Sequence, residues 1–219
     1  METQPTGNSK PVHSSQTGVH PRLPALVARH LKAAWRKPPQ PADAPALAAL
    51  GEALAAHCGP VVLDSFCGTG QSTALLAQRH GDALVIGIDK SAHRLRRHRG
   101  DGNYLLLQAH CEPVWQHLQQ TGLRLAAHYL LYPNPWPKPG QLARRVHGHP
   151  ALPALLALGG QLELRSNWQL YVEEFGVALT LAGHPSRVAL VADGGEPLTR
   201  FEEKYRNSGH ALWHLTATL

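Results

Sequence analysis

The chain has 219 residues, which suits one domain of ordinary size whose hydrophobic core needs no disulfide or metal to stabilise it. Hydrophobic residues make up 43% of it, but no apolar run is long enough to span a membrane and the polar start shows no signal peptide, so we expect neither a membrane nor a secreted protein. The spacing of its three cysteines indicates neither disulfide pairs nor a metal site, which predicts reduced thiols in the cytoplasm. The formal net charge of +6 favours an anionic partner, most commonly nucleic acid.

The N-terminal part of the chain predicts an arm followed by two helices. Residues 1–21 are rich in Ser, Thr, Gln, Gly and Pro without periodic apolar positions, which is typical of a flexible arm. Residues 24–37 have one apolar and one basic face, as expected for a packed helix. The prolines of residues 38–41 end it, and a second helix over 44–57 leads into the central strand of one folded domain, residues 22–219.

The next stretch reads as a buried strand, a glycine turn and a helix. The apolar run that starts at Val61 ends in Asp64, and Gly68 and Gly70 allow the backbone to turn tightly before a helix over 71–80. A second strand, over 83–88, ends in Asp89 roughly 20 residues past the glycines, where nucleotide-binding folds place an acid for the ribose hydroxyls. We therefore predict a nucleotide-binding α/β fold.

The spacing of the glycines separates two classes of cofactor. A dinucleotide fingerprint has a third small residue, where this chain has Thr73. Asp64 would repel a pyrophosphate but attract the ammonium of an amino-acid moiety. This favours S-adenosylmethionine, which has an ammonium, a sulfonium and no phosphate. A turn needed only for packing is the alternative when the loop is considered by itself.

After Asp89, the segment 91–99 begins with an N-cap candidate and holds the densest run of positive charge in the chain. It is either a solvated helix face or a surface for phosphates, with Arg94, Arg96 and Arg97 as candidates. A buried strand over 103–108 follows. Ligands of open parallel sheets lie at the carboxyl ends of the strands, so the turn at residues 109–111 is expected to flank an adenine.

Residues 126–138 form the second informative stretch, a buried strand that ends in a rigid loop. Three prolines alternate with Asn134 and Trp136, so the strand cannot continue and these side chains are held at set angles. Asn134 offers an acceptor and donors, and Trp136 offers a face for a base or a cation. A proline-rich turn with Trp136 in the core is the alternative.

The remainder predicts the rest of an open sheet of seven strands. The expected elements are a helix over 144–158, a strand over 161–165, a helix over 169–182, a strand over 187–192, a short helix from 199 and a final strand over 210–219.

Several of these motifs together resemble the bacterial tRNA guanine-N7 methyltransferase family. The resemblance covers most of the chain after residue 60 and is carried by residues 64–70, 86–89, 132–138, 144–145, 166–171 and 199–202. It implies a Rossmann-like class I methyltransferase fold with strand order 3-2-1-4-5-7-6 and an antiparallel last strand. It also implies S-adenosylmethionine as cofactor and a guanine in the variable loop of tRNA as substrate, with the protein a monomer or a homodimer.

The resemblance further implies the roles of individual residues. It places the cofactor on Asp64, Cys67, Gly68, Gly70, Asp89, Lys90, Ala109, His110 and Asn134. It places the RNA substrate on Trp136, Lys138, Arg144, Arg145, Asn167, Tyr171, Thr199 and Glu202, with Asn134 and Asn167 at the reacting atoms.

The chain departs from this family at acidic positions. Asn134 and Asn167 stand where the family has Asp, and His110 stands about where it has an acid. Guanine N7 attacks through an in-plane lone pair and loses no proton, so a general base is not obligatory, but a carboxylate holds the donor edge of guanine better than an amide. Two alternatives therefore stay open: a methyltransferase retuned to another RNA nucleophile, an exocyclic amine or a small molecule, and a non-catalytic RNA-binding relative.

Overall fold

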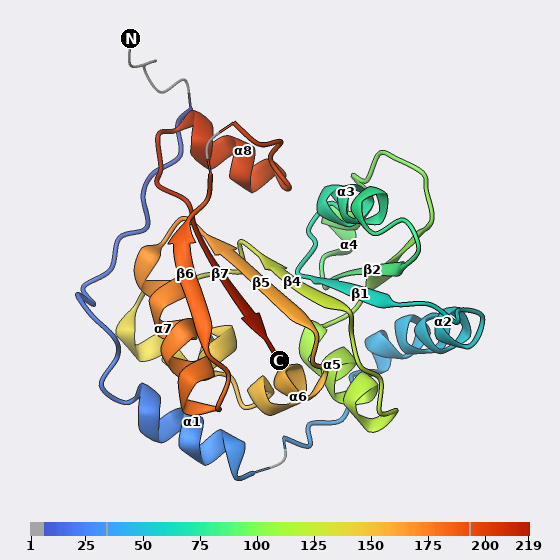
Figure 1. Ribbon diagram of the computed structural model, residues 1–219, viewed down its shortest axis with the longest axis horizontal. Helices are drawn as coiled ribbons and strands as arrows, with labels where there is room; N and C mark the ends of the chain where they lie inside the picture. Colours follow the sequence, from blue (N-terminus) through green and yellow to red (C-terminus); the bar gives the residue numbers. More distant parts are fainter. Residues whose placement is uncertain (1–6, 34, 193) are drawn as a thin grey trace.

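The computed structural model describes residues 7–33, 35–192 and 194–219, and its centre is a seven-stranded sheet of order β3-β2-β1-β4-β5-β7-β6 (Figure 1). Six strands run in the same direction, and β7 runs antiparallel to both of its neighbours, β5 and β6. The sequence-based prediction of fold and strand order is confirmed. The strands are β1 Val61–Ser65, β2 Leu84–Asp89, β3 Tyr104–Gln108, β4 Ala127–Leu131, β5 Gln161–Ser166, β6 Ser186–Leu190 and β7 Trp213–Thr218.

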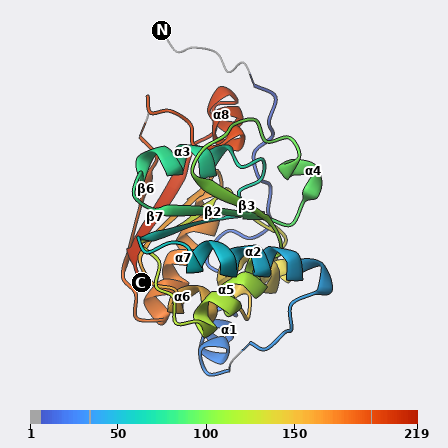
Figure 2. The same ribbon diagram turned by 90° about the vertical axis from the view of Figure 1, so that its right-hand side faces the viewer.

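Helices flank both faces of the sheet, with α3 on one side and α2, α5, α6 and α7 on the other (Figure 2). None of the helices in the described part of the chain is long and apolar enough to cross a membrane. The helices are α1 Leu23–Leu31, α2 Ala44–Ala55, α3 Gln71–Arg79, α4 Ala92–Leu95, α5 Cys111–Gln120, α6 Leu152–Ala157, α7 Gln169–Leu181 and α8 Arg200–Asn207.

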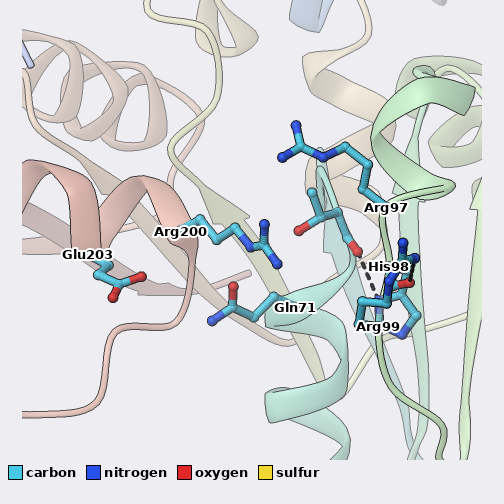
Figure 3. A pocket seen from close by; sticks show the side chains of 7 residues that line it. Gln71, Arg97, His98, Arg99, Arg200 and Glu203 are labelled. Carbon is cyan, nitrogen blue, oxygen red and sulfur yellow. Dashed lines mark hydrogen bonds between the residues drawn. The ribbon is translucent and has the colours of Figure 1, made fainter.

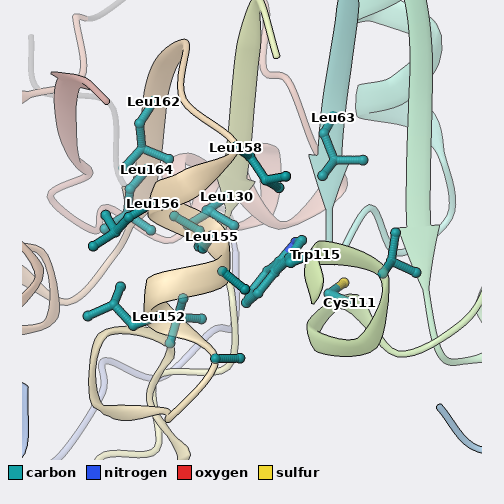
Figure 4. Packing of buried hydrophobic residues seen from close by; sticks show 14 of the residues in the cluster. Leu63, Cys111, Trp115, Leu130, Leu152, Leu155, Leu156, Leu158, Leu162 and Leu164 are labelled. Atoms are coloured by element: carbon teal, nitrogen blue, oxygen red, sulfur yellow. The ribbon is translucent and has the colours of Figure 1, made fainter. Parts of the chain in front are cut away.

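The main core lies between the sheet and the layer of α5, α6 and α7. Trp115 of α5 is fully buried among leucines of α6 and of the strands (Figure 4). Its indole Nε1 donates to Ser65 Oγ at 2.9 Å, and Ser65 Oγ also contacts His128 Nε2 at 2.8 Å, so these buried polar atoms are paired. Burial lowers the pKa of His128 to about 3, so the ring is neutral and acts as a core residue.

Some helices differ from the sequence-based expectation. The helix expected over 144–158 is replaced by tight 3₁₀ turns followed by the short α6, because Pro150 keeps His149 extended and Gly148 packs against the Leu142 carbonyl. The basic helix expected over 91–99 shortens to α4. Helix α5 was not expected, although its Pro113 lies in the first turn, where proline is tolerated.

Residues 7–20 contain no helix or strand and run along the body of the protein from α8 to α1 (Figure 1). Gly7 N–H donates to the Asn207 carbonyl at 2.6 Å, and Ser9 N–H donates to Ser208 Oγ at 3.0 Å. Residues 1–6 of the predicted arm, and residue 34 of the helix predicted over 24–37, lie outside the described residues.

Candidate active site at the carboxyl edge of the sheet

A cavity of about 590 Å³ lies where several strands end at the same edge of the sheet. Parallel strands bring their carboxyl ends together, so residues far apart in sequence meet there. The lining includes Phe66 after β1, Asp89 at the end of β2, Ala109 and His110 after β3, Tyr132, Asn134 and Trp136 after β4, Asn167 after β5, and Phe201 and Tyr205 of α8.

The backbone at this cavity is strained. Among the described residues, the only non-glycine residues with positive φ are Phe66 (65°), Tyr132 (55°) and Trp136 (45°), and all three line the cavity. Bulky side chains in this conformation cost of order 1–3 kcal/mol each and cluster at functional sites. The unusual backbone angles direct three aromatic side chains towards the same cavity.

The glycine turn after β1 is fixed by hydrogen bonds to β2. Gly70 has φ 78°, and a Cβ there would lie 2.7 Å from Leu106 Cδ1, so no other residue fits without a shift. A Cβ on Gly68 would meet no atom within 4 Å, so a ligand can approach the backbone closely at this point. Gly68 N–H donates to Asp89 Oδ2 at 3.1 Å, which ties the turn to the acid of β2.

Asp89 accepts two hydrogen bonds and forms one ion pair. The hydrogen bonds come from Gly68 N–H and from Ser91 N–H at 2.7 Å, and Nη1 of Arg94 lies 3.1 Å from Asp89 Oδ2. A carboxylate has about four lone-pair sites, so one remains for a ligand hydroxyl. Asp89 is 2% exposed and lines the cavity.

Asp64 is fully buried and faces α3, outside the cavity lining. Its Oδ2 accepts from the hydroxyls of Ser72 and Thr73 at 2.6 and 2.8 Å, whereas its Oδ1 has no partner among the described residues. Burial raises the pKa of Asp64 to about 6, and the nearby Asp89 contributes to this rise. Cys67, Gly68 and Gly70 likewise lie in the turn and not in the lining, while Lys90 lines the cavity.

His110 and Ala109 form the wall after β3. Asp43, just before α2, accepts from the backbone N–H of His110 at 3.0 Å and contacts its ring Nδ1 at 3.1 Å. Burial by itself would raise the pKa of Asp43, but the hydrogen bonds from His110 and Gln40 lower it below its ordinary value. The buried carboxylate therefore fixes the orientation of the His110 ring.

Asn134 is exposed in the cavity wall and uses one of its two polar atoms within its own loop. Its Oδ1 accepts from Trp136 N–H at 3.2 Å, and only the carbonyl oxygen of the amide can accept this bond. The amide NH₂ has no partner among the described residues and presents donors. Arg144 covers the Trp136 ring, with its guanidinium carbon 5.0 Å from the ring centre.

Asn167 also lines the cavity, and its amide is oriented by His210. Nε2 of His210 contacts the Ser9 carbonyl at 3.0 Å, so in the neutral ring it carries the proton and Nδ1 accepts from Asn167 Nδ2 at 3.1 Å. The carbonyl oxygen of Asn167 has no partner in the described part of the chain. Asn134 thus offers a donor and Asn167 an acceptor to the same cavity.

Arg145 is fully buried and holds the proline loop of residues 132–138 from behind. It forms an ion pair with the buried Glu174, donates from Nε to the Trp136 carbonyl at 3.1 Å and lies over the Trp168 ring at 5.0 Å. Gln16 of the N-terminal segment bridges the pair, since its Oε1 accepts from Arg145 Nη2 and its Nε2 donates to Glu174. Arg145, predicted to contact RNA, is therefore turned into the core behind the loop and does not line the cavity.

Other residues predicted to bind substrate are also buried or make contacts within the fold. Tyr171 is fully buried against His147, 4.9 Å between ring centres. Thr199 caps α8 by accepting from Glu202 N–H at 2.9 Å, and the fully buried Glu202 side chain pairs with Arg165 and Arg206. Of the substrate residues that the resemblance implied, Trp136, Arg144 and Asn167 line the cavity, and the exposed Lys138 lies outside its lining.

The sequence did not predict that Phe66, Phe201 and Tyr205 line the cavity. Phe201 and Tyr205 stand four residues apart on α8, so both face the same side, and Tyr205 stacks on His210 and packs against Tyr132. The spacing of the two aromatic residues on a polar helix was the available signal. Phe66, directly before the glycine turn, carried no signal of its own.

The sheet order, the glycine turn after β1 and the acid that ends β2 define a Rossmann-like methyltransferase fold. The 16S rRNA methyltransferase KamB aligns with a TM-score of 0.57 and 21% identity, over 78% of this chain and 93% of that one. The antibiotic-resistance methyltransferase Kmr aligns with a TM-score of 0.52 and 22% identity, over 78% of this chain and 91% of that one.

Residues 58–215 match a family described as "Putative methyltransferase", and the chain belongs to this family. Similar curated proteins are named tRNA (guanine-N(7)-)-methyltransferase. The protein of Paracidovorax citrulli is 30% identical over 193 residues, 81% of this chain and 73% of that protein. The protein of Thiobacillus denitrificans is 28% identical over 176 residues, 75% of this chain and 77% of that protein.

Proposed function

We propose that this protein is an S-adenosylmethionine-dependent methyltransferase that methylates N7 of a guanine in tRNA. The observation that carries the proposal is the single cavity that joins Asp89 and His110 at one end to Asn134 and Asn167 at the other. A methyl donor and an acceptor base placed in one space can meet without solvent between them. The names of the curated relatives and the net charge of +6 support tRNA as the substrate.

The residues at the strand ends fit S-adenosylmethionine. We assign the ribose hydroxyls to the remaining lone pair of Asp89, the adenine to the wall of Ala109 and His110, and the amino-acid end to the open space at Gly68. The unpartnered Oδ1 of Asp64 contributes negative charge behind that turn, where an ammonium is stabilised. When bound, this cofactor supplies an electrophilic methyl group on a sulfonium.

The substrate end fits an unstacked base. Trp136, Tyr132, Phe201 and Tyr205 supply aromatic faces on which single-stranded bases stack. Because guanine N7 attacks through an in-plane lone pair without losing a proton, these residues need to position the base and not to deprotonate it. The free carbonyl of Asn167 is an acceptor for the N–H edge of guanine, and we assign Asn134 and Asn167 to contacts with the base.

We keep the prediction that residues 1–21 form an arm outside the methyltransferase domain of residues 22–219. Ser9, Ser14 and Gln16 of this arm contact His210, Pro137 and Glu174, which support the two walls of the substrate end. If this arm detached from the domain, both walls would lose these hydrogen bonds. We place the reaction in the cytoplasm, where both tRNA and S-adenosylmethionine are present.

The test is methyl transfer to unmodified tRNA transcripts from S-adenosylmethionine with an isotope-labelled methyl group. Nucleosides from the digested tRNA are separated and identified by mass spectrometry. We expect labelled 7-methylguanosine, and less of it from the Asp89→Ala variant at a cofactor concentration that does not saturate its weakened site. Label on another nucleoside would show a retuned pocket. RNA binding and cofactor binding without any transfer would show a non-catalytic relative and overturn the proposal.

A further inference from the structure

A second cavity, of about 570 Å³, lies between the glycine turn, the segment after α4 and helix α8 (Figure 3). The function proposed above makes no use of it. Its lining consists of Thr69, Gln71, Arg97, His98, Arg99, Arg200 and Glu203.

The lining carries an excess of positive charge. Three arginines face one glutamate, and within the described residues no carboxylate lies within 4.0 Å of the guanidinium of Arg97, Arg99 or Arg200. Arg99 donates to the carbonyls of Arg96 and His98, so its donors are partly used. Arg97 and Arg200 form no side-chain hydrogen bond in the described part of the chain, which leaves their donors for a ligand.

The walls that hold these two arginines are well fixed. His98 contacts the Thr69 carbonyl at 2.8 Å and Tyr104 Oη at 2.6 Å, which ties the basic segment to the glycine turn and to β3. Arg200 is the first residue of α8, which Thr199 caps, and it extends towards the side of the cavity that carries Gln71 and Arg97 (Figure 3). Like charges brought towards one cavity repel each other, and an anion between them removes that cost.

Helix α8 separates this cavity from the active site and belongs to both. Phe201 and Tyr205 face the active-site cavity, whereas Arg200 and Glu203 face the basic one. The segment after β2 is shared in the same way, since Arg94 lines the first cavity and Arg97 the second. The two cavities are therefore neighbours that share α8 and the segment after β2.

We propose that the basic cavity binds a backbone phosphate of the RNA next to the methylated nucleotide, with Arg97 and Arg200 as its cationic donors. Guanidinium groups pair with phosphate oxygens through two parallel hydrogen bonds, and the Gln71 amide adds a neutral donor. S-adenosylmethionine has no phosphate, so this ligand is not part of the cofactor. The inference rests on the proposed RNA substrate.

The experiment compares RNA binding by the wild type and by an Arg97→Ala, Arg200→Ala variant, with unmodified tRNA in fluorescence anisotropy titrations at several salt concentrations. Each lost phosphate contact lowers the slope of log affinity against log salt by roughly 0.7–0.9, and the double variant loses the one phosphate that both arginines bind, so its slope should fall by about that amount. An Arg29→Ala, Arg187→Ala variant is the matched control, because it removes two exposed arginines outside this cavity. We expect its slope to equal that of the wild type.

Calorimetry with S-adenosylmethionine must give the same affinity for all three proteins, which shows that the variants are folded. An Arg97→Lys, Arg200→Lys variant keeps the charges and is expected to recover most of the slope. Equal slopes for the double alanine variant and its control overturn the inference, as does a wild type that binds no RNA. Methyl transfer to guanine with equal slopes leaves the proposed function intact, whereas a lowered slope without any transfer retains the phosphate site and refutes the proposed function.

Discussion

The two ends of the active-site cavity are built differently. The cofactor end consists of the glycine turn, Asp89 and His110. Gly68 and Ser91 N–H bind Asp89 from within about 20 residues of sequence, and among the described residues only the His110 wall has a distant partner, Asp43. The substrate end depends on partners from distant parts of the chain. Asn167 is oriented by His210, and Arg145 holds the proline loop through Glu174 and Gln16.

The cofactor end therefore consists mainly of features common to this class of fold, whereas the substrate end depends on residues particular to this chain. At the cofactor end, Asp64 and Asp89 are the carboxylates that the resemblance to the tRNA guanine-N7 methyltransferase family implies, and His110 departs from it, whereas the substrate end has amides at 134 and 167. Damage at the cofactor end should therefore change cofactor affinity with little effect on the rest. Damage at the substrate end should change stability and substrate choice together.

Glu174→Gln is expected to have the largest effect. It leaves Arg145 buried without a counter-charge, and breaking a buried pair in this way costs about 3–5 kcal/mol of unfolding free energy. Urea denaturation at neutral pH measures it. Arg145→Met combined with Glu174→Gln removes both charges and should recover part of the loss. A single Glu174→Gln variant as stable as the wild type would show that the pair does not support the substrate end.

The same pair predicts a dependence of stability on pH. Burial by itself would raise the pKa of Glu174, but hydrogen bonds from His147 and His20 and the charge of Arg145 lower it from 4.5 to about 2. A carboxyl with a lowered folded-state pKa stabilises the protein above pH 4.5, and this contribution, about 3 kcal/mol, is lost as the pH falls towards 2.

Urea denaturation of the wild type and of Glu174→Gln between pH 2 and pH 6 measures this dependence. The difference in stability between the two proteins should shrink as the pH falls. A difference that stays constant across this range would exclude Glu174 as its source.

Asp89→Ala tests the cofactor end. Loss of a hydrogen bond to a charged group should weaken the binding of S-adenosylmethionine by about 1.5–3 kcal/mol in calorimetry, while RNA affinity stays the same. Asp82→Ala is the matched control, because Asp82 is an exposed acid outside the cavity. Circular dichroism verifies the fold of both variants, and unchanged cofactor affinity in a folded Asp89→Ala protein would refute the assignment.

Thr199→Ala should have a smaller effect on stability. It removes the cap of α8, the helix shared by both cavities, at a cost of about 1 kcal/mol. For a chain of this length, that corresponds to a fall in Tm of about 2–4 °C. Thr199→Ser keeps the accepting hydroxyl and should melt with the wild type. Equal melting of the alanine variant would mean that the cap does not hold α8.

The sequence predicted the elements whose signals are local. Val61 to Gly70 and the acid Asp89 carry a strand, a turn and the end of the next strand within a short span, so these elements and the place of Asp89 in the cavity wall could be predicted. The burial of Arg145 and Glu202 could not, because it depends on Glu174 and Arg165, 29 and 37 residues away in the sequence. A basic or acidic residue in a recognised motif looks the same in the sequence whether it faces solvent or the core.

The most direct test of the account compares methyl transfer to unmodified tRNA by the wild type and by Asn134→Asp. The carboxylate that this substitution introduces would keep the bond to Trp136 N–H and offer a second acceptor where the amide now offers donors. If the cavity holds guanine by its N–H edge, a carboxylate binds that edge better and favours the cationic product, so kcat/KM should rise while cofactor affinity stays the same. Loss of the native activity in Asn134→Asp, with cofactor still bound, would contradict the guanine-N7 assignment and indicate a substrate that needs the amide donors.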